Sequence, residues 1–251
     1  MKIQLLKGKN AVITGCNRGI GKAILTEYAN NGANCICCVR NKSDEFENFC
    51  KKLANENKVK IDIVLLDLKE NKNVSDSVKK IFALTKKIDI LINNAGILFN
   101  ALFSMTSEAK LKEMFQINFF SQIHLTQLIS REMMKNKKGN IIFISSTSAE
   151  GRDQGRFAYS SSKAAISSAT RVLANELGLY GIRVNSINPG LTDTSMMREN
   201  TSEAIIKKEL EKTSLKRLAE PSEIANFAVF LGSEMSSYIN GQNLRIDGGL
   251  Q

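Results

Sequence analysis

The sequence of 251 residues has one histidine, two prolines and no apolar run long enough to cross a bilayer. His124 has no second histidine and no obvious carboxylate partner, so we expect it on a helix face and expect no metal site. Neither Pro189 nor Pro221 interrupts a predicted helix, and Pro221 predicts the start of a final helix. These scarcities exclude a membrane-spanning protein and a histidine-based metalloenzyme.

The cysteines are few and crowd the first fifth of the chain, in an odd number and without disulfide or zinc spacing. They are Cys16, Cys35, Cys37, Cys38 and Cys50. We expect reduced, packed thiols, with Cys35 and Cys37 on one strand face and Cys38 on the other. Cys16, in a glycine-rich turn, is a candidate for oxidation. No secretory apolar segment precedes the first strand pattern, so we expect a soluble, cytoplasmic protein.

A net charge of +10 raises the question of nucleic-acid binding. Lysine pairs such as Lys51-Lys52 and Lys137-Lys138 are spread between acidic residues and form no basic stripe. The charge therefore indicates solvated faces and no nucleic-acid partner. It could still steer anionic substrates.

Seven short apolar runs recur at the spacing of strands, with helical patterns between them. They begin at Asn10, Asn34, Ile61, Ile88, Asn140, Ile182 and Asn243. Runs rich in Ile, Val and Leu suit strands covered on both faces, and strand–helix alternation suits a parallel sheet. The sequence therefore predicts one α/β domain over residues 1–251, a three-layer, doubly wound fold with a seven-stranded parallel sheet.

The first predicted strand ends in a glycine-rich turn, TGCNRGIG, which leads into a helix. Gly15, Gly19 and Gly21 let the backbone approach a pyrophosphate, and the helix N-terminus offers free N–H groups and a positive dipole end. Glycines also mark ordinary turns, but the position after a strand favours a dinucleotide site. The other candidate contacts in this turn are Asn17, Arg18 and Ile20.

Taken in order, the motifs resemble those of the classical short-chain dehydrogenase/reductase family over essentially the whole chain. They are TGCNRGIG, NNAG at 93–96, Asn118 in INFFS, Ser146 in ISSTS, Tyr159 with Lys163 in YSSSK, NPG at 188–190 and DGG at 247–249. The resemblance implies a Rossmann fold, a nicotinamide cofactor and hydride transfer to or from a carbonyl carbon. It also implies a homotetramer that assembles through the helices of Asn118 and Tyr159 and the C-terminal strand.

The end of the second predicted strand, CICCVRN, indicates which nicotinamide cofactor is bound. A carboxylate there holds a free ribose 2′-hydroxyl, whereas a 2′-phosphate needs that carboxylate absent and a cation nearby. Val39 stands where the carboxylate would be expected, Arg40 follows it, and Arg18 lies in the glycine turn. Two guanidiniums can bind a phosphate by bidentate hydrogen bonds. We therefore expect NADP(H), although either arginine alone would suit an exposed loop.

The resemblance implies further cofactor contacts. Asp67 resembles an adenine-contacting acid, with Leu68 beside it, but an Asp at a strand end is equally often a helix cap. In the NNAG run Asn93 is the expected cofactor neighbour, and Thr192 resembles a residue that hydrogen-bonds the nicotinamide carboxamide. The remaining expected contacts are Ala95, Gly96, Tyr159, Lys163, Pro189 and Gly190.

Tyr159 and Lys163 stand four positions apart, on one face of a predicted helix. A free tyrosine ionises near pH 10, so acid–base work near neutrality requires a lower pKa, which Lys163 and an oxidised nicotinamide both favour. In the reductive direction the phenol gives its proton to the developing alkoxide.

Two further residues complete the predicted catalytic set. Ser146 is expected to donate to the substrate carbonyl, and family spacing selects it from Ser145, Thr147 and Ser148. Asn118 resembles the residue that positions a water for proton relay through Lys163.

Within the family, the chain most resembles 3-oxoacyl-acyl-carrier-protein reductases, in GRFAYSSSKAA, IRVNSINPG and YINGQNLRIDGG. An acyl carrier protein is then an expected partner, although Tyr180 stands where those reductases carry a docking arginine. Lys137, Lys138 or Arg171 could still meet an acidic carrier. The alternatives are a reductase of a small ketone, sugar or polyketide intermediate and, outside enzymology, an NADP(H)-sensing protein, which loss of Ser, Tyr or Lys would have favoured.

Substrate specificity is expected in residues 191–220, whose mix of charged and apolar residues suits a mobile lid. Met196 and Met197 could line an apolar pocket there or anchor a lid helix.

Overall fold

The computed structural model describes residues 4–250, so the first three residues and the last residue of the predicted domain lie outside it. One parallel sheet has the strand order β3-β2-β1-β4-β5-β6-β7. Its strands are β1 (Asn10–Thr14), β2 (Asn34–Val39), β3 (Ile61–Leu65), β4 (Ile90–Asn93), β5 (Gly139–Ile144), β6 (Ile182–Pro189) and β7 (Asn243–Ile246). Each strand begins within two residues of its predicted start. The predicted seven-stranded, doubly wound sheet is confirmed.

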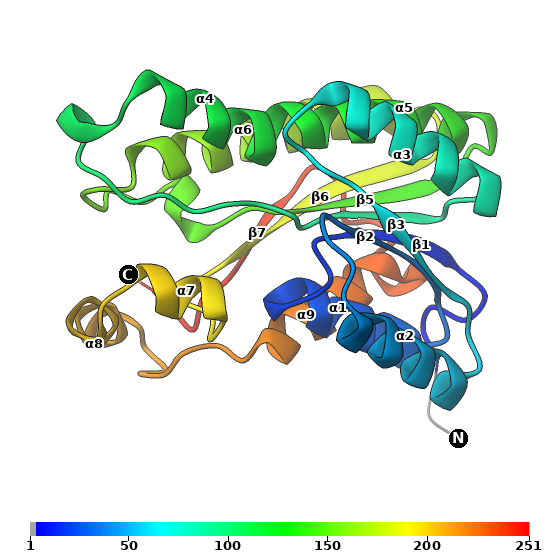
Figure 1. Cartoon of the computed structure of the whole chain (residues 1–251), viewed down its shortest axis with the longest axis horizontal. Helices are drawn as coiled ribbons and strands as arrows, with labels where there is room; N and C mark the ends of the chain where they lie inside the picture. Colours follow the sequence, from blue (N-terminus) through cyan, green and yellow to red (C-terminus); the bar gives the residue numbers. More distant parts are fainter. Residues whose placement is uncertain (1–3, 251) are drawn as a thin grey trace.

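Helices cover both faces of the sheet and make three layers (Figure 1). One face carries α1 (Gly19–Asn30), α2 (Asp44–Asn57) and α9 (Pro221–Gly232). The other carries α3 (Asn71–Leu84), α4 (Glu108–Phe115), α5 (Ser121–Lys135) and α6 (Phe157–Gly178). Pro221 is the first residue of α9, as predicted, where its missing N–H costs no helical hydrogen bond.

Two apolar cores lie on the two faces of the sheet, because successive side chains of each strand point to opposite sides. Cys35 and Cys37 pack in one core with Cys16 and Cys50, and Cys38 packs in the other. All five cysteines are free and buried, and burial raises the pKa of Cys35 and Cys38. Reactive cysteines are exposed thiolates, so the complete burial of Cys16 gives no support to its predicted oxidation.

The single histidine lies on a helix face, as expected: the His124 ring of α5 hydrogen-bonds the hydroxyl of Ser75 on α3 at 2.9 Å. No helix within residues 4–250 is long and apolar enough to cross a membrane. Over the same residues, no group of three metal-ligating side chains comes together.

The segment 191–220 contains two short helices, α7 (Ser195–Asn200) and α8 (Glu203–Lys212). They lie apart from the two main helix layers, beside the end of the sheet at the left of Figure 1. Ligands of open α/β sheets bind beyond the carboxyl ends of the strands, which is where this segment leaves β6.

Candidate active site

A cavity of about 990 Å³ lies beyond the carboxyl ends of the central strands. Its walls come from the turn after β1, the loops after β4 and β5, the start of α6 and the segment that contains α7 and α8. The strand order reverses between β1 and β4, and such switch points are where doubly wound sheets bind their ligands.

The glycine-rich turn forms one end of the cavity and requires glycine for two reasons. Gly15 has a φ of +67°, and a Cβ on it would lie 2.8 Å from the Cα of Ala95. Asn94 holds the turn against the neighbouring loop, since its Nδ2 donates to the carbonyls of Thr14 and Gly15 at 2.9 and 3.0 Å. The turn leads directly into the N-terminus of α1, where free N–H groups favour an anion.

Both predicted phosphate-binding arginines line this end of the cavity. Arg40 is exposed just after β2, and the preceding Val39 is buried, so no carboxylate stands at the strand end. Arg18 reaches α7, where its Nη1 lies 3.8 Å from Glu199 and donates to Ser195 at 3.5 Å. Two guanidiniums therefore line the same cavity as the glycine-rich turn.

Asp67 and Leu68 also line the cavity. The helix-cap alternative for Asp67 is wrong, because the N-cap residue of α3 is Glu70. The Asp67 carboxylate instead accepts the N–H of Lys69 at 3.0 Å, which closes a short local turn. This leaves Asp67 at the cavity wall, where the adenine contact was predicted.

The predicted cofactor contact of Asn93 needs correction. Asn93 is the last residue of β4 and is fully buried, and its Nδ2 donates to the hydroxyl of Thr126 on α5 at 2.9 Å. It does not line the cavity, whereas Asn94, Ala95 and Gly96 do. Neighbouring side chains at a strand end point in opposite directions, and NNAG alone does not show which asparagine faces the site.

Tyr159 and Lys163 both line the cavity, on the first two turns of α6. The Lys163 Nζ is 5.8 Å from the centre of the Tyr159 ring and donates to the carbonyl of Ile144 at 2.8 Å. Burial lowers the pKa of Lys163 to about 8. Burial raises the pKa of Tyr159, while a hydrogen bond with Ser146 and the charge of Arg156 act to lower it. The phenol is therefore the resting form, which suits a proton donor.

The serines after β5 divide into one structural and one available hydroxyl. Ser145 is buried and donates to the carbonyl of Lys163 at 3.1 Å, so it fastens α6 to the sheet. Ser146 lines the cavity, and its oxygen accepts the N–H of Ser148 at 3.1 Å. Because that bond uses a lone pair, the Ser146 hydrogen can donate either to the Tyr159 oxygen or to a substrate oxygen that takes its place.

Asn118 is fully buried in a π-helical turn, Gln116–Phe120, between α4 and α5. Its side chain accepts the N–H of Ile97 at 2.9 Å and donates to the Ile97 carbonyl at 3.0 Å and the Ser162 hydroxyl at 3.1 Å. It thus ties the loop after β4 to the residue that precedes Lys163. Turns of this kind are frequent at functional sites.

The NPG run forms another part of the cavity wall. Gly190 is required there because a Cβ on it would lie 2.8 Å from the Cα of Asp247 in the DGG run. Pro189, Gly190 and Thr192 all line the cavity, and the Thr192 hydroxyl donates to the Gly190 carbonyl at 3.0 Å.

Comparison with known proteins decides the family. A family model described as enoyl-(acyl carrier protein) reductase matches residues 15–251. The chain belongs to the short-chain dehydrogenase/reductase family. It is 34% identical over 245 residues to the 3-oxoacyl-[acyl-carrier-protein] reductase of Aquifex aeolicus, covering 98% of both chains.

Solved structures of short-chain dehydrogenases show the same architecture with different cofactors. A 7α-hydroxysteroid dehydrogenase complexed with NADH and 7-oxo glycochenodeoxycholic acid is 35% identical, with a TM-score of 0.90 over 97% of this chain and 94% of that chain. A short-chain dehydrogenase from Burkholderia cenocepacia in complex with NADP is 27% identical, with a TM-score of 0.90 over 98% of this chain and 99% of that chain. The protein is thus an oxidoreductase with a nicotinamide cofactor.

Several charged residues at the cavity wall of this short-chain dehydrogenase were not predicted from its sequence. They are Arg152, Asp153, Arg156, Lys208, Glu209 and Lys212. They come from the loop before α6 and from α8, about fifty residues apart in the chain. No local pattern marks them, because only the fold brings the two segments together.

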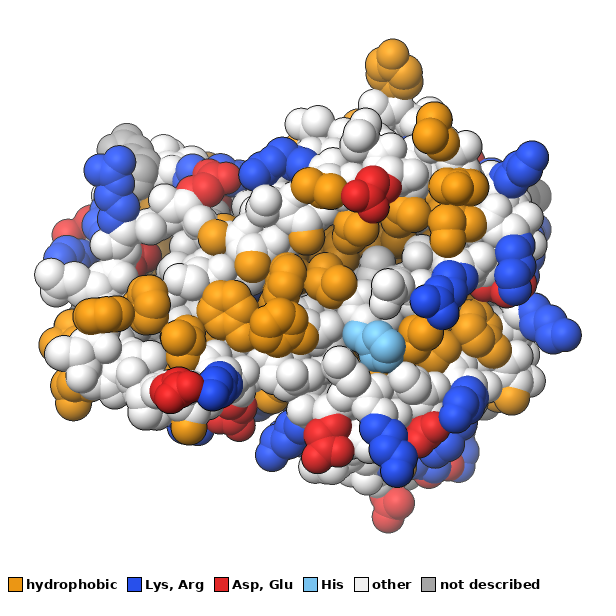
Figure 2. Space-filling view, turned by 90° about the horizontal axis from the view of Figure 1, so that it is seen from above, with side chains coloured by type: hydrophobic (Ala, Val, Ile, Leu, Met, Phe, Trp, Pro, Cys, Tyr) orange, Lys and Arg blue, Asp and Glu red, His pale blue; other side chains and the backbone are white. Residues whose placement is uncertain are grey.

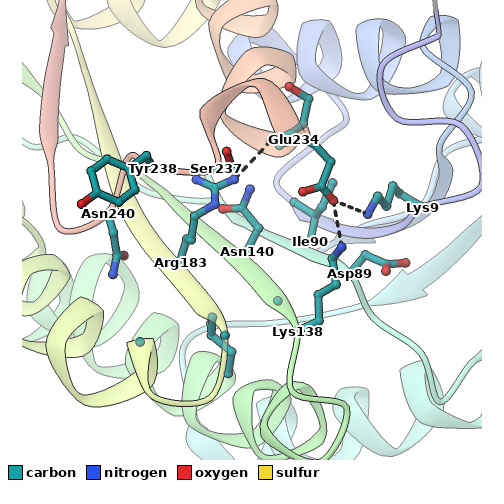
Figure 3. Close-up of a pocket in the computed structure, with 16 residues that line it drawn as sticks. Lys9, Asp89, Ile90, Lys138, Asn140, Arg183, Glu234, Ser237, Tyr238 and Asn240 are labelled. Atoms are coloured by element: carbon teal, nitrogen blue, oxygen red, sulfur yellow. Dashed lines mark hydrogen bonds and ion pairs between the residues drawn. The ribbon is translucent and has the colours of Figure 1, made fainter.

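A second cavity of about 520 Å³ lies at the opposite, amino-terminal edge of the sheet (Figure 3). Its cations already have partners: Lys9 and Lys138 lie 3.2 and 2.9 Å from Glu234. Arg183 donates to the carbonyls of Ile239, Leu231 and Ser233. None of the predicted site residues lines this cavity, and its ion pairs join the end of α9 to the sheet.

Proposed function

We propose that the protein is an NADPH-dependent reductase that converts a ketone to a secondary alcohol, with a 3-oxoacyl thioester carried by an acyl carrier protein as its substrate. The observation that carries the proposal is that Ser146, Tyr159 and Lys163 share one cavity with the glycine-rich turn. When bound, the nicotinamide cofactor supplies the hydride. The cradle around Gly15 and the two arginines fit such a dinucleotide.

The residues around the carbonyl then handle the proton. The Ser146 hydroxyl donates to the substrate oxygen and holds it beside Tyr159, which stabilises the developing negative charge. The Tyr159 phenol transfers its proton to that oxygen, and the Lys163 ammonium stabilises the phenolate that remains. The carbonyl of Ile144 fixes the lysine for this role.

Asn118 belongs to the relay that returns a proton to Tyr159. Its amide fixes the loop at Ile97 and the hydroxyl of Ser162 within one network, beside the Lys163 ammonium: a Cβ built on Gly96 would lie 3.1 Å from the Asn118 Oδ1 and 3.7 Å from the Lys163 Nζ. A water between the two residues would carry the proton from solvent to the lysine.

NADPH is the proposed cofactor because of the charge at the adenosine end. Arg40 and Arg18 line the cavity, and Val39 occupies the place of a ribose-binding carboxylate. A guanidinium stabilises a 2′-phosphate and offers nothing comparable to a lone 2′-hydroxyl.

The lid over the substrate is the segment 191–220, and its apolar side chains suit an acyl chain. Met196, Met197 and Ile205 line the cavity, and Met197 is buried, so it both lines the pocket and anchors α7. The second candidate is a free ketone. Tyr180, exposed after α6, gives an acidic carrier no cation at this position. The similar steroid dehydrogenase was solved with 7-oxo glycochenodeoxycholic acid, a free ketone.

A second copy of the chain is the proposed partner of the outer helix layer. Figure 2 looks onto that layer and shows apolar side chains gathered on it. Exposed apolar residues there include Phe120 in the π-helical turn, Val172 in α6 and Leu179 just after α6. We place this homotetramer in the cytoplasm, where free cysteines are kept reduced.

The test is oxidation of NADPH and, separately, NADH by the pure protein with an acetoacetyl thioester, a carrier-bound 3-oxoacyl chain, diketones and keto-sugars. Turnover of the thioesters with NADPH is the expected result. Activity on another ketone alone would move the protein to the second candidate. NADPH binding without turnover of any carbonyl would favour the cofactor-sensing alternative.

A further inference from the structure

The substrate end of the cavity carries more positive charge than its own carboxylates balance. Arg152 and Arg156 line it from the loop before α6, and Lys208 and Lys212 line it from α8. Glu209 and Asp153 are the acidic residues of the same wall.

Both of these carboxylates face Lys212. Glu209 forms an ion pair with Lys212 at 2.6 Å, and Glu209 and, more weakly, Asp153 raise the pKa of that lysine. Within residues 4–250, Arg152, Arg156 and Lys208 take part in no ion pair and no side-chain hydrogen bond. Three cations thus line one cavity without a partner among the described residues.

Arg156 lies closest to the chemistry. It is the residue before α6 and stands three positions ahead of Tyr159, one helical turn away, and its charge acts on the Tyr159 phenol. An anion that paired with Arg156 would therefore lie in the cavity that Tyr159 lines, and Lys208 lines the same cavity from α8.

We propose that Arg156, with Lys208 and Arg152, binds an anionic group on the substrate, so that the preferred ketone carries a phosphate or a carboxylate. This rests on the proposed ketone-reductase function and names its substrate class. An anionic substrate also gains from steering by the net charge of +10. Two sources share this chemistry: the phosphate of a phosphopantetheine thioester and the carboxylate of a free oxo acid.

The test measures binding in the Tyr159→Phe protein saturated with NADP⁺, so that no turnover is needed. Calorimetry compares two matched pairs: acetoacetyl phosphopantetheine against acetoacetyl pantetheine, and 4-oxopentanoate against its methyl ester. We expect the charged member of one pair to bind at least about tenfold more tightly, which is about 1.4 kcal/mol. The pair that shows this preference identifies the source of the anion.

The preference should fall at least about tenfold with an added Arg156→Gln change, and severalfold with Lys208→Gln. Lys207→Gln is the matched control, because Lys207 is the neighbouring exposed lysine of α8 but does not line the cavity. Equal binding of charged and neutral ligands in both pairs, or an equal loss with Lys207→Gln, would overturn the proposal. NADP⁺ binding by each variant shows that it folds. If Arg156→Gln does not fold, Lys208→Gln still tests the proposal, because Lys208 is exposed on the lid.

Failure of the anion-site proposal can be distinguished from failure of the proposed reductase function. If the wild type reduces no ketone but the protein still prefers charged ligands, the proposed reductase function is wrong and the anion site stands. If the wild type reduces ketones and shows no charge preference, the reductase function stands and the anion site is wrong.

Discussion

The Lys163 ammonium lies 5.8 Å from the centre of the Tyr159 ring and is held by the carbonyl of Ile144 rather than by any carboxylate of the described residues. A buried lysine of this kind favours its neutral form, and its pKa falls to about 8. The charge that the mechanism needs therefore costs stability, and this can be measured.

We predict that stability contributed through Lys163 rises with pH above about 8. The folded protein loses the Lys163 proton near pH 8, whereas the unfolded chain keeps it to about pH 10.5, so the unfolded state binds more protons across that window. The free energy of unfolding of the wild type should rise relative to Lys163→Met by up to about 3 kcal/mol between pH 8 and 10.5. Urea unfolding of both proteins across these pH values measures it, and parallel pH profiles would contradict it.

The Gly15→Ala protein should lose NADPH affinity by at least about tenfold. The new Cβ would lie 2.8 Å from the Cα of Ala95 in a backbone with φ of +67°. Gly8→Ala is the matched control, since Gly8 has φ of +73° with nothing within 4 Å of an added Cβ. Fluorescence titration with NADPH should separate the two variants; equal affinities would show that the close approach to Ala95 is not needed.

Changing Arg40 to Asp should shift the cofactor preference from NADPH toward NADH. The change removes a cation from the 2′-phosphate and supplies a carboxylate for a 2′-hydroxyl, so the ratio of kcat/KM values should move by about 10- to 100-fold. Arg131→Asp, on the exposed side of α5, controls for the change in net charge. An unchanged ratio for Arg40→Asp would remove this arginine from phosphate recognition.

Much of the fold could be predicted because each buried parallel strand is a short apolar run between turn residues. Such a run can be recognised from neighbouring residues alone. The glycine turn, Ser146, Tyr159 and Lys163 were predictable because their order and spacing follow a known family. Their roles remain predictions, although the structure brings all four features to one cavity.

What the sequence did not show depends on direction and on distant contacts. Strand alternation turns Asn93 toward Thr126 and leaves Asn94 at the cavity, and only the structure reveals which of the two faces it. Ser145 and Ser146 are adjacent hydroxyls whose separate roles follow from the Lys163 carbonyl that one of them binds. Arg156 and Lys208 line one cavity, and no local pattern in the sequence predicts this because they lie about fifty residues apart.

The central claim is that the Tyr159 phenol donates the proton that completes ketone reduction. The most direct measurement is stopped-flow NADPH oxidation by Tyr159→Phe against the best ketone of the wild type, with NADPH affinity measured on the same sample. Tyr180→Phe is the control, because Tyr180 is exposed and lies outside the cavity. We predict a rate about 10²- to 10⁴-fold lower for Tyr159→Phe with NADPH affinity within about twofold. A wild-type rate in Tyr159→Phe would contradict the account.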